Sequence, residues 1–146
     1  LTTLDIDPLA KPGIEWDLNE RPLPFADDAF DQIHAYEVLE HIGVQGYWRA
    51  FFDEFGEYWR ILKPGGVLCG TVPDWRGEWA WGDPGHTRVI TPGSFAFLSQ
   101  AEYRAQVGKT RMTDYRAVYK ADFERLESKV QDGFHYFVLK AVKGGV

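Results

Sequence analysis

Residues 45–72 constrain the fold of this chain more than any other segment. Large apolar side chains recur there every three or four residues, which predicts an amphipathic helix with one buried face from about Gln45 to Leu62. The sequence Lys63-Pro64-Gly65-Gly66 ends this helix, and the apolar run from Val67 to Val72 predicts a buried strand. The residues of the helical stripe are Trp48, Phe51, Phe52, Phe55, Tyr58, Trp59 and Leu62.

A segment from Phe30 to Tyr36 precedes this helix and predicts another strand, with Ile33 and Ala35 on one face and His34 on the other. Strand, helix and strand with a tight Pro-Gly-Gly connection form the unit from which parallel α/β sheets are built. The centre of the chain therefore predicts an α/β fold.

Weaker patterns flank this unit. An Asp132-Gly133 turn between two strand-like segments predicts an antiparallel hairpin at the sheet edge, although the charges of the first segment also suit a helix. Residues 101–120 give no clear pattern. The expected elements are brief strands at Thr2–Ile6 and Ile14–Trp16, a helix start at Glu37–Ile42, a helix at 93–100 behind Thr91-Pro92, and strands at Ala121–Val130 and Phe134–Val142.

Composition and charge argue against several classes of protein. Aromatic residues make up 16% of the chain, enough for a packed core, and the net charge of −6 disfavours a broad nucleic-acid surface because phosphate binding needs clustered Lys and Arg. Cys69 is the only cysteine, so no internal disulfide can form and a cytoplasmic location is expected. No apolar run approaches the ~20 residues of a membrane span, so no membrane partner is expected.

Three motifs follow one another between residues 4 and 72. The first is Leu4-Asp5-Ile6-Asp7, an acidic end to a strand. The second is Asp17-Leu18, followed by Leu23-Pro24-Phe25-Ala26-Asp27-Asp28-Ala29-Phe30-Asp31 and His34-Ala35-Tyr36-Glu37-Val38-Leu39-Glu40-His41. The third is Trp59-Arg60-Ile61-Leu62-Lys63-Pro64-Gly65-Gly66. In order and spacing they resemble the class I S-adenosylmethionine-dependent methyltransferase family.

The resemblance implies a Rossmann-like, doubly wound, mostly parallel sheet with a C-terminal antiparallel hairpin. It also implies S-adenosylmethionine as the cofactor, bound at the carboxyl ends of the strands. A strand-end acid would hold the ribose, the Asp17-Leu18 pair would lie at the adenine, and the residues after the third strand would lie beside the methionine part. Turn capping by the aspartates and plain packing of Tyr36 are the alternatives. The expected cofactor-binding residues are Asp5, Asp7, Asp17, Leu18, Ala35, Tyr36 and Glu37.

One family feature is missing from the sequence. The family has a glycine-rich turn after its first strand, where the backbone approaches the cofactor, and nothing ahead of Asp5 supplies it. The chain opens within an expected strand, and Met112 is its only methionine. We therefore expect one methyltransferase domain over residues 1–146 that lacks this central strand and loop and binds cofactor poorly without them. We also expect Leu1–Asp7 to lie alongside the sheet, pointing toward its mouth near Tyr36.

Glu37, Glu40 and His41 are spaced so that a helix would place all three side chains on one face. Two carboxylates and an imidazole can hold a divalent cation, and His86 is the one plausible further ligand. The set resembles the metal site of small-RNA 2′-O-methyltransferases and some quinone O-methyltransferases. The same motif also starts a helix without any metal in the wider family, so the sequence favours no metal and leaves these four residues as the alternative.

The loop from Asp74 to Arg88 is the candidate substrate site, because it follows a strand end and is rich in aromatic and ionisable groups. His86 is the candidate catalytic base for an oxygen acceptor. A DNA-base acceptor is disfavoured, because the Asp/Asn-Pro-Pro-aromatic turn typical of DNA amino-methyltransferases is absent after Ala35 and Cys69 lies in an apolar strand. The expected substrate-contacting residues are Asp74, Trp75, Trp79, Trp81 and Arg88.

Three alternatives stay open at this point. The tryptophans of the loop also suit an aromatic cover over the sheet or a homodimer contact. A non-catalytic scaffold with the same fold is the second alternative. The third is a nicotinamide-dependent short-chain reductase, whose catalytic Tyr and Lys have the spacing of Tyr136 and Lys140, although these two residues lie in an expected strand.

Overall fold

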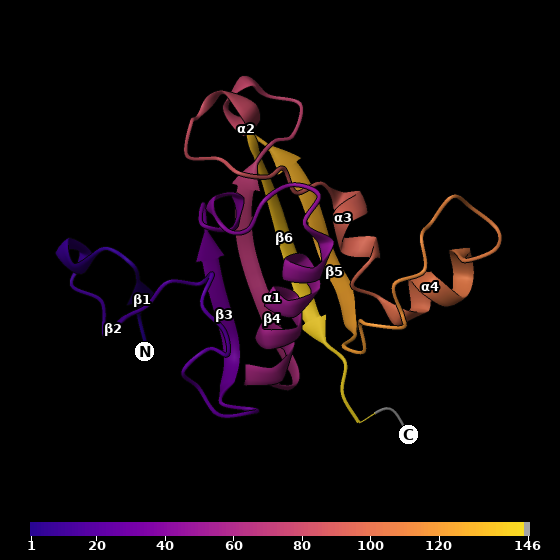
Figure 1. The fold of residues 1–146 in the computed structure, drawn as a ribbon, viewed down its shortest axis with the longest axis horizontal. Coiled ribbons are helices and arrows are strands. Elements are labelled where there is room, and N and C mark those ends of the chain that lie inside the picture. Colours follow the sequence, from indigo (N-terminus) through magenta and orange to yellow (C-terminus); the bar gives the residue numbers. More distant parts are fainter. Residues whose placement is uncertain (145–146) are drawn as a thin grey trace.

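The computed structural model describes residues 1–144; residues 145–146 of the expected domain lie outside the described part. Figure 1 shows the elements in order along the chain. The strands are β1 (Leu4–Asp5), β2 (Ile14–Glu15), β3 (Phe30–Tyr36), β4 (Leu62–Pro73), β5 (Phe123–Gln131) and β6 (Phe134–Ala141), and the helices are α1 (Trp48–Ile61), α2 (Glu78–Gly82), α3 (Pro92–Ala96) and α4 (Gln100–Gln106), with short 3-10 turns η1 (Pro8–Ala10) and η2 (Leu39–His41).

The main sheet has four strands in the order β3-β4-β6-β5. β3 runs parallel to β4, whereas β6 is antiparallel to both of its neighbours. The C-terminal hairpin turns at Asp132 and Gly133, which both have positive φ angles, and it places β5 at the edge of the sheet. The predicted fold class, an α/β sheet with an antiparallel C-terminal hairpin, is confirmed.

The core forms between α1 and the main sheet. The apolar stripe predicted for the helix packs on the core: Phe52, Phe55 and Tyr58 are buried in α1 and Leu62 at the start of β4. The other predicted members, Trp48, Phe51 and Trp59, are partly buried against it. The buried side chains join a cluster that includes Leu68 of β4 and residues of β6. The central strand β4 and the helix before it therefore share one core, as the helix–strand pattern predicted.

Two boundaries differ from the sequence-based expectation. The segment Lys63–Gly66 lies inside β4 rather than in a separate turn, because α1 ends directly at the start of the strand. A Cβ on Gly66 would lie 2.9 Å from the carbonyl oxygen of Asp31, so glycine is needed where β4 passes close to β3. The expected helix at Glu37–Ile42 is wrong: Glu37 has a φ of 54°, in the left-handed region, and only the short 3-10 turn η2 follows.

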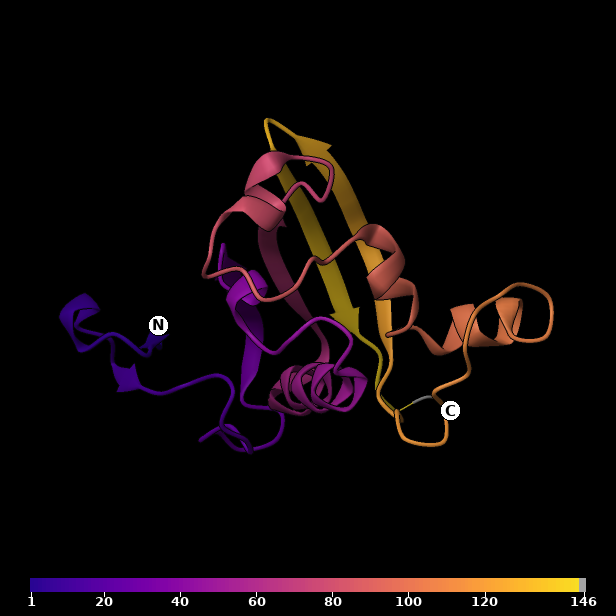
Figure 2. The same ribbon diagram turned by 45° about the horizontal axis from the view of Figure 1, so that its top comes forward.

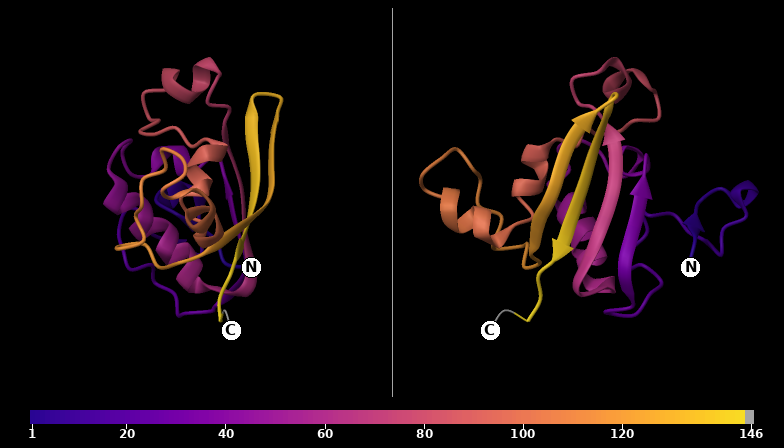
Figure 3. Two further views of the ribbon diagram at one scale, coloured as in Figure 1. Left: turned by 90° about the vertical axis from the view of Figure 1, so that its right-hand side faces the viewer. Right: turned by 180° about the vertical axis from the view of Figure 1, so that it is seen from behind.

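All helices of the described residues lie on the same face of the main sheet (Figure 3, left). Burial alternates along β6, with buried side chains on that face and more exposed ones on the other. The resemblance implied helices on both faces, and within residues 1–144 only one face is covered. No helix in the described part of the chain is long and apolar enough to cross a membrane.

The first strands stand apart from the main sheet. β1 and β2 pair in parallel with each other, in a sheet of two strands. This pair lies beyond β3, on the side away from β4 (Figures 1 and 3). We expected Leu1–Asp7 to lie alongside the main sheet. The segment lies to the side of that sheet, but no strand pairing joins β1 to β3, so the expectation is met only in part.

Candidate functional site at the ends of β3 and β4

The segments that follow β3 and β4 meet at the carboxyl ends of these strands. The backbone N–H of Glu37 donates to the carbonyl oxygen of Thr71 at 2.9 Å, which joins the two strand ends. The chain after α2 then passes over η2 on its way to α3 (Figure 2), and the N–H of Thr87 donates to the carbonyl oxygen of Glu40 at 2.9 Å. The loop after β4 is thus held across the end of β3, where the sequence placed a substrate site.

Arg88 fixes the far end of this loop. Its side chain is buried, and its guanidinium donates to a carboxylate oxygen of Glu54 and to the carbonyl oxygen of Leu39, both at 2.8 Å. Glu54 is also buried and lies on α1. A buried ion pair of this kind holds its surroundings in one arrangement, since breaking it would leave a charge without a partner. The position of Arg88 favours an anchoring role over the predicted contact with substrate.

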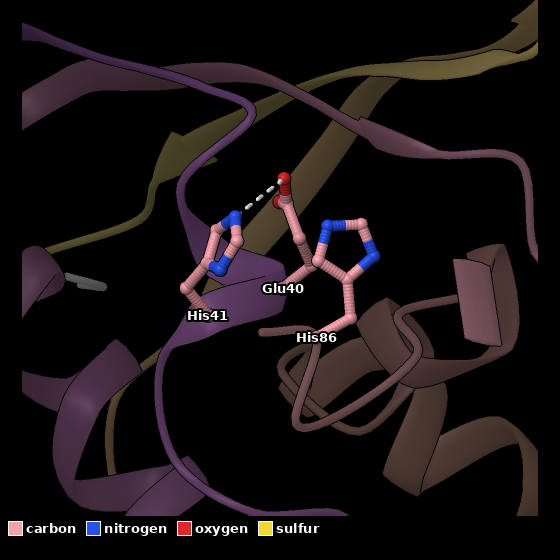
Figure 4. Close-up of side chains that lie close together, drawn as sticks. All are labelled: Glu40, His41 and His86. Atoms are coloured by element: carbon pink, nitrogen blue, oxygen red, sulfur yellow. Dashed lines mark ion pairs between the residues drawn. The ribbon is translucent and has the colours of Figure 1, made fainter. Parts of the chain in front are cut away.

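Glu40, His41 and His86 come together beneath this crossing (Figure 4). One ligand-type atom from each side chain lies within 4.8 Å of the others. The distance from His41 Nε2 to Glu40 Oε1 is 3.7 Å, and the two imidazole rings meet edge to face with centroids 4.8 Å apart. The structure therefore brings His86 to the Glu-x-x-Glu-His segment, which the sequence could only offer as an alternative.

Two backbone carbonyls orient the imidazoles. His41 Nδ1 lies 2.9 Å from the carbonyl oxygen of Gly85, and His86 Nδ1 lies 2.7 Å from that of Trp79. A carbonyl oxygen only accepts hydrogen bonds, so each Nδ1 carries a hydrogen, and in the neutral ring each Nε2 has a lone pair. Figure 4 shows both rings turned toward the Glu40 carboxylate.

Burial raises the pKa values of the two nearby glutamates. Desolvation is the main cause at Glu40, and the neighbouring charge of Glu37 adds to it. At Glu37 desolvation also dominates, while a hydrogen bond from the Thr71 side chain and the two histidines oppose it. Each glutamate has one buried carboxylate oxygen without a hydrogen-bond partner among the described residues. The site therefore contains buried carboxyl oxygens that the described residues do not satisfy.

The three predicted aspartates lie at turns near β1 and β2. Asp5 ends β1 and accepts a hydrogen bond from the N–H of Asp7 at 2.9 Å. Asp7 caps η1 by accepting from the N–H of Leu9, and Asp17 accepts from the N–H of Asn19. All three thus make the local turn contacts that were the alternative to cofactor binding, although Asp5 remains exposed at a strand end.

Asn19 connects the Asp17-Leu18 loop to the segment after η2. Its side-chain oxygen accepts a hydrogen bond from the N–H of Gly43 at 2.9 Å, just after η2. Leu18 packs against the main core. The sequence analysis did not single out Asn19; its position directly after the Asp-Leu pair was the available signal. This contact holds the Asp17-Leu18 loop, one of the predicted cofactor segments, against the chain that follows β3 and η2.

The predicted residues at the end of β3 divide between the two faces. Ala35 is buried toward the helices, whereas Tyr36 is 58% exposed on the uncovered face, with its hydroxyl 2.6 Å from His34 Nδ1. Tyr36 therefore does not serve as core packing, which was the alternative interpretation of this residue. Glu37, next along the chain, turns back toward Thr71.

The predicted substrate residues of the loop differ in exposure. Asp74 is held by Arg76, which lowers the pKa of the Asp74 carboxyl through hydrogen bonds and charge. Trp75 packs edge to face on His135, with ring centroids 5.7 Å apart. Trp79 and Trp81 are 72% and 67% exposed. The two outer tryptophans on α2 are therefore available for contact with another molecule.

A cavity of about 400 Å³ lies between α1 and the segment that begins at Arg88, and no sequence pattern predicted it. Its walls come from the segments around Gly43–Trp48 and Arg88–Ser94, together with Tyr115. The aromatic residues of the helical stripe gave a partial signal, because Phe51 and Phe52 also line this cavity. The contribution of Tyr115, from the unassigned segment 101–120, had no sequence signal.

The reductase alternative loses its support here. Tyr136 and Lys140 both lie on β6, and Lys140 is paired with Glu124 across the hairpin. A strand rises about 3.3 Å per residue, so four residues separate the two side chains by roughly 13 Å along β6 instead of one helical turn.

Residues 9–70, somewhat less than half of the chain, match the family model described as a methyltransferase domain. This stretch includes the second motif and the third, so the part of the chain that carries these motifs is similar to that family. No curated protein matches the sequence significantly.

Solved structures share the fold at low identity. A methyltransferase in complex with the Haloferax volcanii Trm112 methyltransferase activator has a TM-score of 0.54 at 16% identity, over 87% of this chain and 60% of its own. The S-adenosylmethionine-dependent methyltransferase of Mesorhizobium loti has a TM-score of 0.51 at 15% identity, over 94% and 78%. The [4+2]-cyclase SpnF has a TM-score of 0.53 at 18% identity, over 88% of this chain and 55% of its own.

These similarities establish that the chain has the class I S-adenosylmethionine-dependent methyltransferase fold. Because one neighbour is described as a cyclase, the fold alone does not specify the reaction. The chain spans 60% and 55% of the lengths of two of these neighbours.

Proposed function

We propose that this chain, whose residues 9–70 match the model of a methyltransferase domain, binds S-adenosylmethionine and takes part in methyl transfer to an oxygen or small-molecule acceptor. The observation that carries this proposal is the hydrogen bond between Asn19 and Gly43, which joins the Asp17-Leu18 loop to the segment that follows β3 and η2. In α/β folds of this kind, ligands bind where such strand ends converge. The bound cofactor would supply an electrophilic methyl group on a sulfonium.

The residues present fit the cofactor in part. Asp5 is exposed at the end of a strand, where a carboxylate can accept hydrogen bonds from ribose hydroxyls. Tyr36 is exposed at the end of β3, where its aromatic face can bind a cation. The described residues include no glycine turn ahead of Asp5. We propose that the family's first strand and its glycine turn belong between β1 and β3, where the two sheets lie side by side without pairing.

The loop over the strand ends would receive the acceptor. The exposed rings of Trp79 and Trp81 favour an apolar or aromatic acceptor over a polyanion. His86 Nε2 has a lone pair that can accept a proton from an acceptor hydroxyl or bind a cation, and it serves only one of these uses at a time. A scaffold without catalysis, acting through the same loop, is the second candidate function.

Isothermal titration calorimetry of the full-length protein with S-adenosylmethionine, and separately with NADPH, tests the proposal. We expect saturable heat with S-adenosylmethionine and none with NADPH. Binding of NADPH alone would support the reductase. Binding of neither cofactor would contradict methyl transfer and support the scaffold.

A further inference from the structure

The cluster of Glu40, His41 and His86 has the composition and shape of a metal site with three protein ligands. Two imidazoles and a carboxylate are a donor set that suits zinc and related divalent ions. Metal–ligand bonds of about 2.1 Å place ligand atoms roughly 3–4 Å apart. The 3.7 Å between His41 Nε2 and Glu40 Oε1 already lies in this range, and small side-chain rotations would bring in His86.

The hydrogen bonds around the cluster prepare both imidazoles for coordination. The carbonyl oxygens of Gly85 and Trp79 hold the Nδ1 hydrogens, so both Nε2 lone pairs remain available. Metal-bound histidines commonly donate their other ring N–H to a backbone carbonyl in this way. One such contact can arise by chance in any loop, but here both rings have one, and both rings turn toward Glu40 (Figure 4). His86 Nε2 also has the Asp83 carboxylate 3.6 Å away.

The Glu40 carboxylate is buried and has an oxygen atom that a positive charge would stabilise. Glu40 is only 2% exposed, and its Oε2 atom has no hydrogen-bond partner among the described residues. Leaving a buried carboxylate oxygen unpaired is costly, whereas a cation would satisfy it. The buried Arg88 does not fill this role, because its guanidinium donates its hydrogen bonds to Glu54 and to the Leu39 carbonyl oxygen.

We propose that Glu40, His41 and His86 bind one divalent cation of the zinc class, with a fourth coordination position left for water or an oxygen ligand. The sequence offered Glu37, Glu40, His41 and His86 as alternative metal ligands. Glu37 lies close by but is not in the cluster whose ligand atoms lie within 4.8 Å of one another, so the proposed site has three protein ligands. The cation would connect the end of β3 to the loop after β4. In this state His86 is a ligand and not a base. Cation binding does not depend on the proposed methyl transfer.

The test uses the full-length protein after removal of metals with a chelator. Calorimetry with Zn²⁺ should give one equivalent of binding, and Co²⁺ should give the visible absorption of a nitrogen- and oxygen-ligated ion. The variants His41→Gln, His86→Gln and Glu40→Gln should each weaken Zn²⁺ binding by more than about 100-fold, the upper end of what losing an outer-shell partner costs. Circular dichroism shows whether each variant is folded.

His34→Gln is the matched control, because His34 is an exposed histidine of β3 that lies outside the cluster. It should bind Zn²⁺ as the unmodified protein does. The proposal is overturned if the unmodified protein does not bind Zn²⁺. It is also overturned if folded His41→Gln and His86→Gln variants keep full affinity, or if His34→Gln loses as much as they do. Because no methyl donor is present, the result is independent of the calorimetry with S-adenosylmethionine.

Discussion

The main sheet and the N-terminal pair of strands carry different parts of the same candidate site and are held in different ways. In the main sheet, α1 covers β4, and the buried residues of the chain begin only at Leu23. β1 and β2 have two residues each and contribute no buried side chain. A two-stranded unit of this size is not stable alone. The N-terminal pair therefore depends on its neighbours for its position, whereas the main sheet supports itself.

The residues proposed for the two ligands lie in different regions of the molecule. Glu40 and His86, each of which has a backbone hydrogen-bond contact with the crossing loop, lie over the main sheet. The exposed acid proposed for the cofactor, Asp5, lies on the pair that is weakly held. The contacts from this pair to the rest of the molecule include the packing of Trp16 and Leu18 and the hydrogen bond between Asn19 and Gly43.

The largest effect is expected at the buried ion pair between Arg88 and Glu54, which holds the loop after β4 to α1. Arg88→Ala leaves Glu54 buried without its partner and should lower the free energy of unfolding by about 3–5 kcal/mol. Urea denaturation followed by circular dichroism measures this change. A loss below about 1 kcal/mol, the range of an exposed pair, would show that the loop is not anchored through this contact.

The same substitution in the two regions gives the most direct comparison. Leu68→Ala, in the centre of β4 where the side chain is 0% exposed, should cost about 2–5 kcal/mol. Leu9→Ala, where the side chain is 86% exposed, should change stability by less than about 0.5 kcal/mol. Equal effects in thermal or urea unfolding would mean that the N-terminal pair is as well packed as the sheet.

Asp5→Ala separates binding from stability. If Asp5 holds the ribose, the variant should lose a charge-assisted hydrogen bond of about 1.5–3 kcal/mol, which is roughly 10- to 150-fold in affinity for S-adenosylmethionine. The unfolding midpoint should not move, because Asp5 is exposed. Glu15→Ala is the matched control, since Glu15 is the exposed partner of Asp5 on β2. Unchanged affinity in Asp5→Ala would refute the ribose assignment.

The smallest effect concerns pH. Burial lowers the pKa of His135 below its usual value near 6.5, with the charge of Arg125 also lowering it, while the nearby Ile90 backbone and the charge of Asp74 oppose this. The folded state therefore favours the neutral ring. Its contribution to stability is present above pH 6.5 and is lost as the pH falls through the lowered value.

His135→Gln should consequently reduce the loss of stability between pH 7 and pH 5, measured by urea unfolding at several pH values. An identical pH dependence in the variant and the unmodified protein would show that His135 titrates normally. The first 20 residues contain no histidine, so this acid sensitivity belongs to the main sheet alone.

Local patterns in the sequence predicted the parts of the fold that depend on near neighbours along the chain. The bounds of β3, the buried stripe of α1, the cap at Thr91 and the hairpin at Asp132-Gly133 all follow from periodicity or turn chemistry. The same patterns identified Glu37, Glu40 and His41 as chemically unusual. They gave the wrong local structure for this segment, because helix spacing does not reveal a residue that adopts a left-handed backbone conformation.

Only the tertiary structure decided which distant segments meet. The approach of His86 to Glu40 depends on a loop that is held by Arg88 on a buried glutamate of α1, and on the carbonyl oxygens of Trp79 and Gly85. Backbone carbonyls have no residue-specific signal, and loop paths depend on contacts between residues far apart in sequence. For the same reason the sequence gives no indication that β1 and β2 pair only with each other, since strand pairing depends on which neighbouring edges are present.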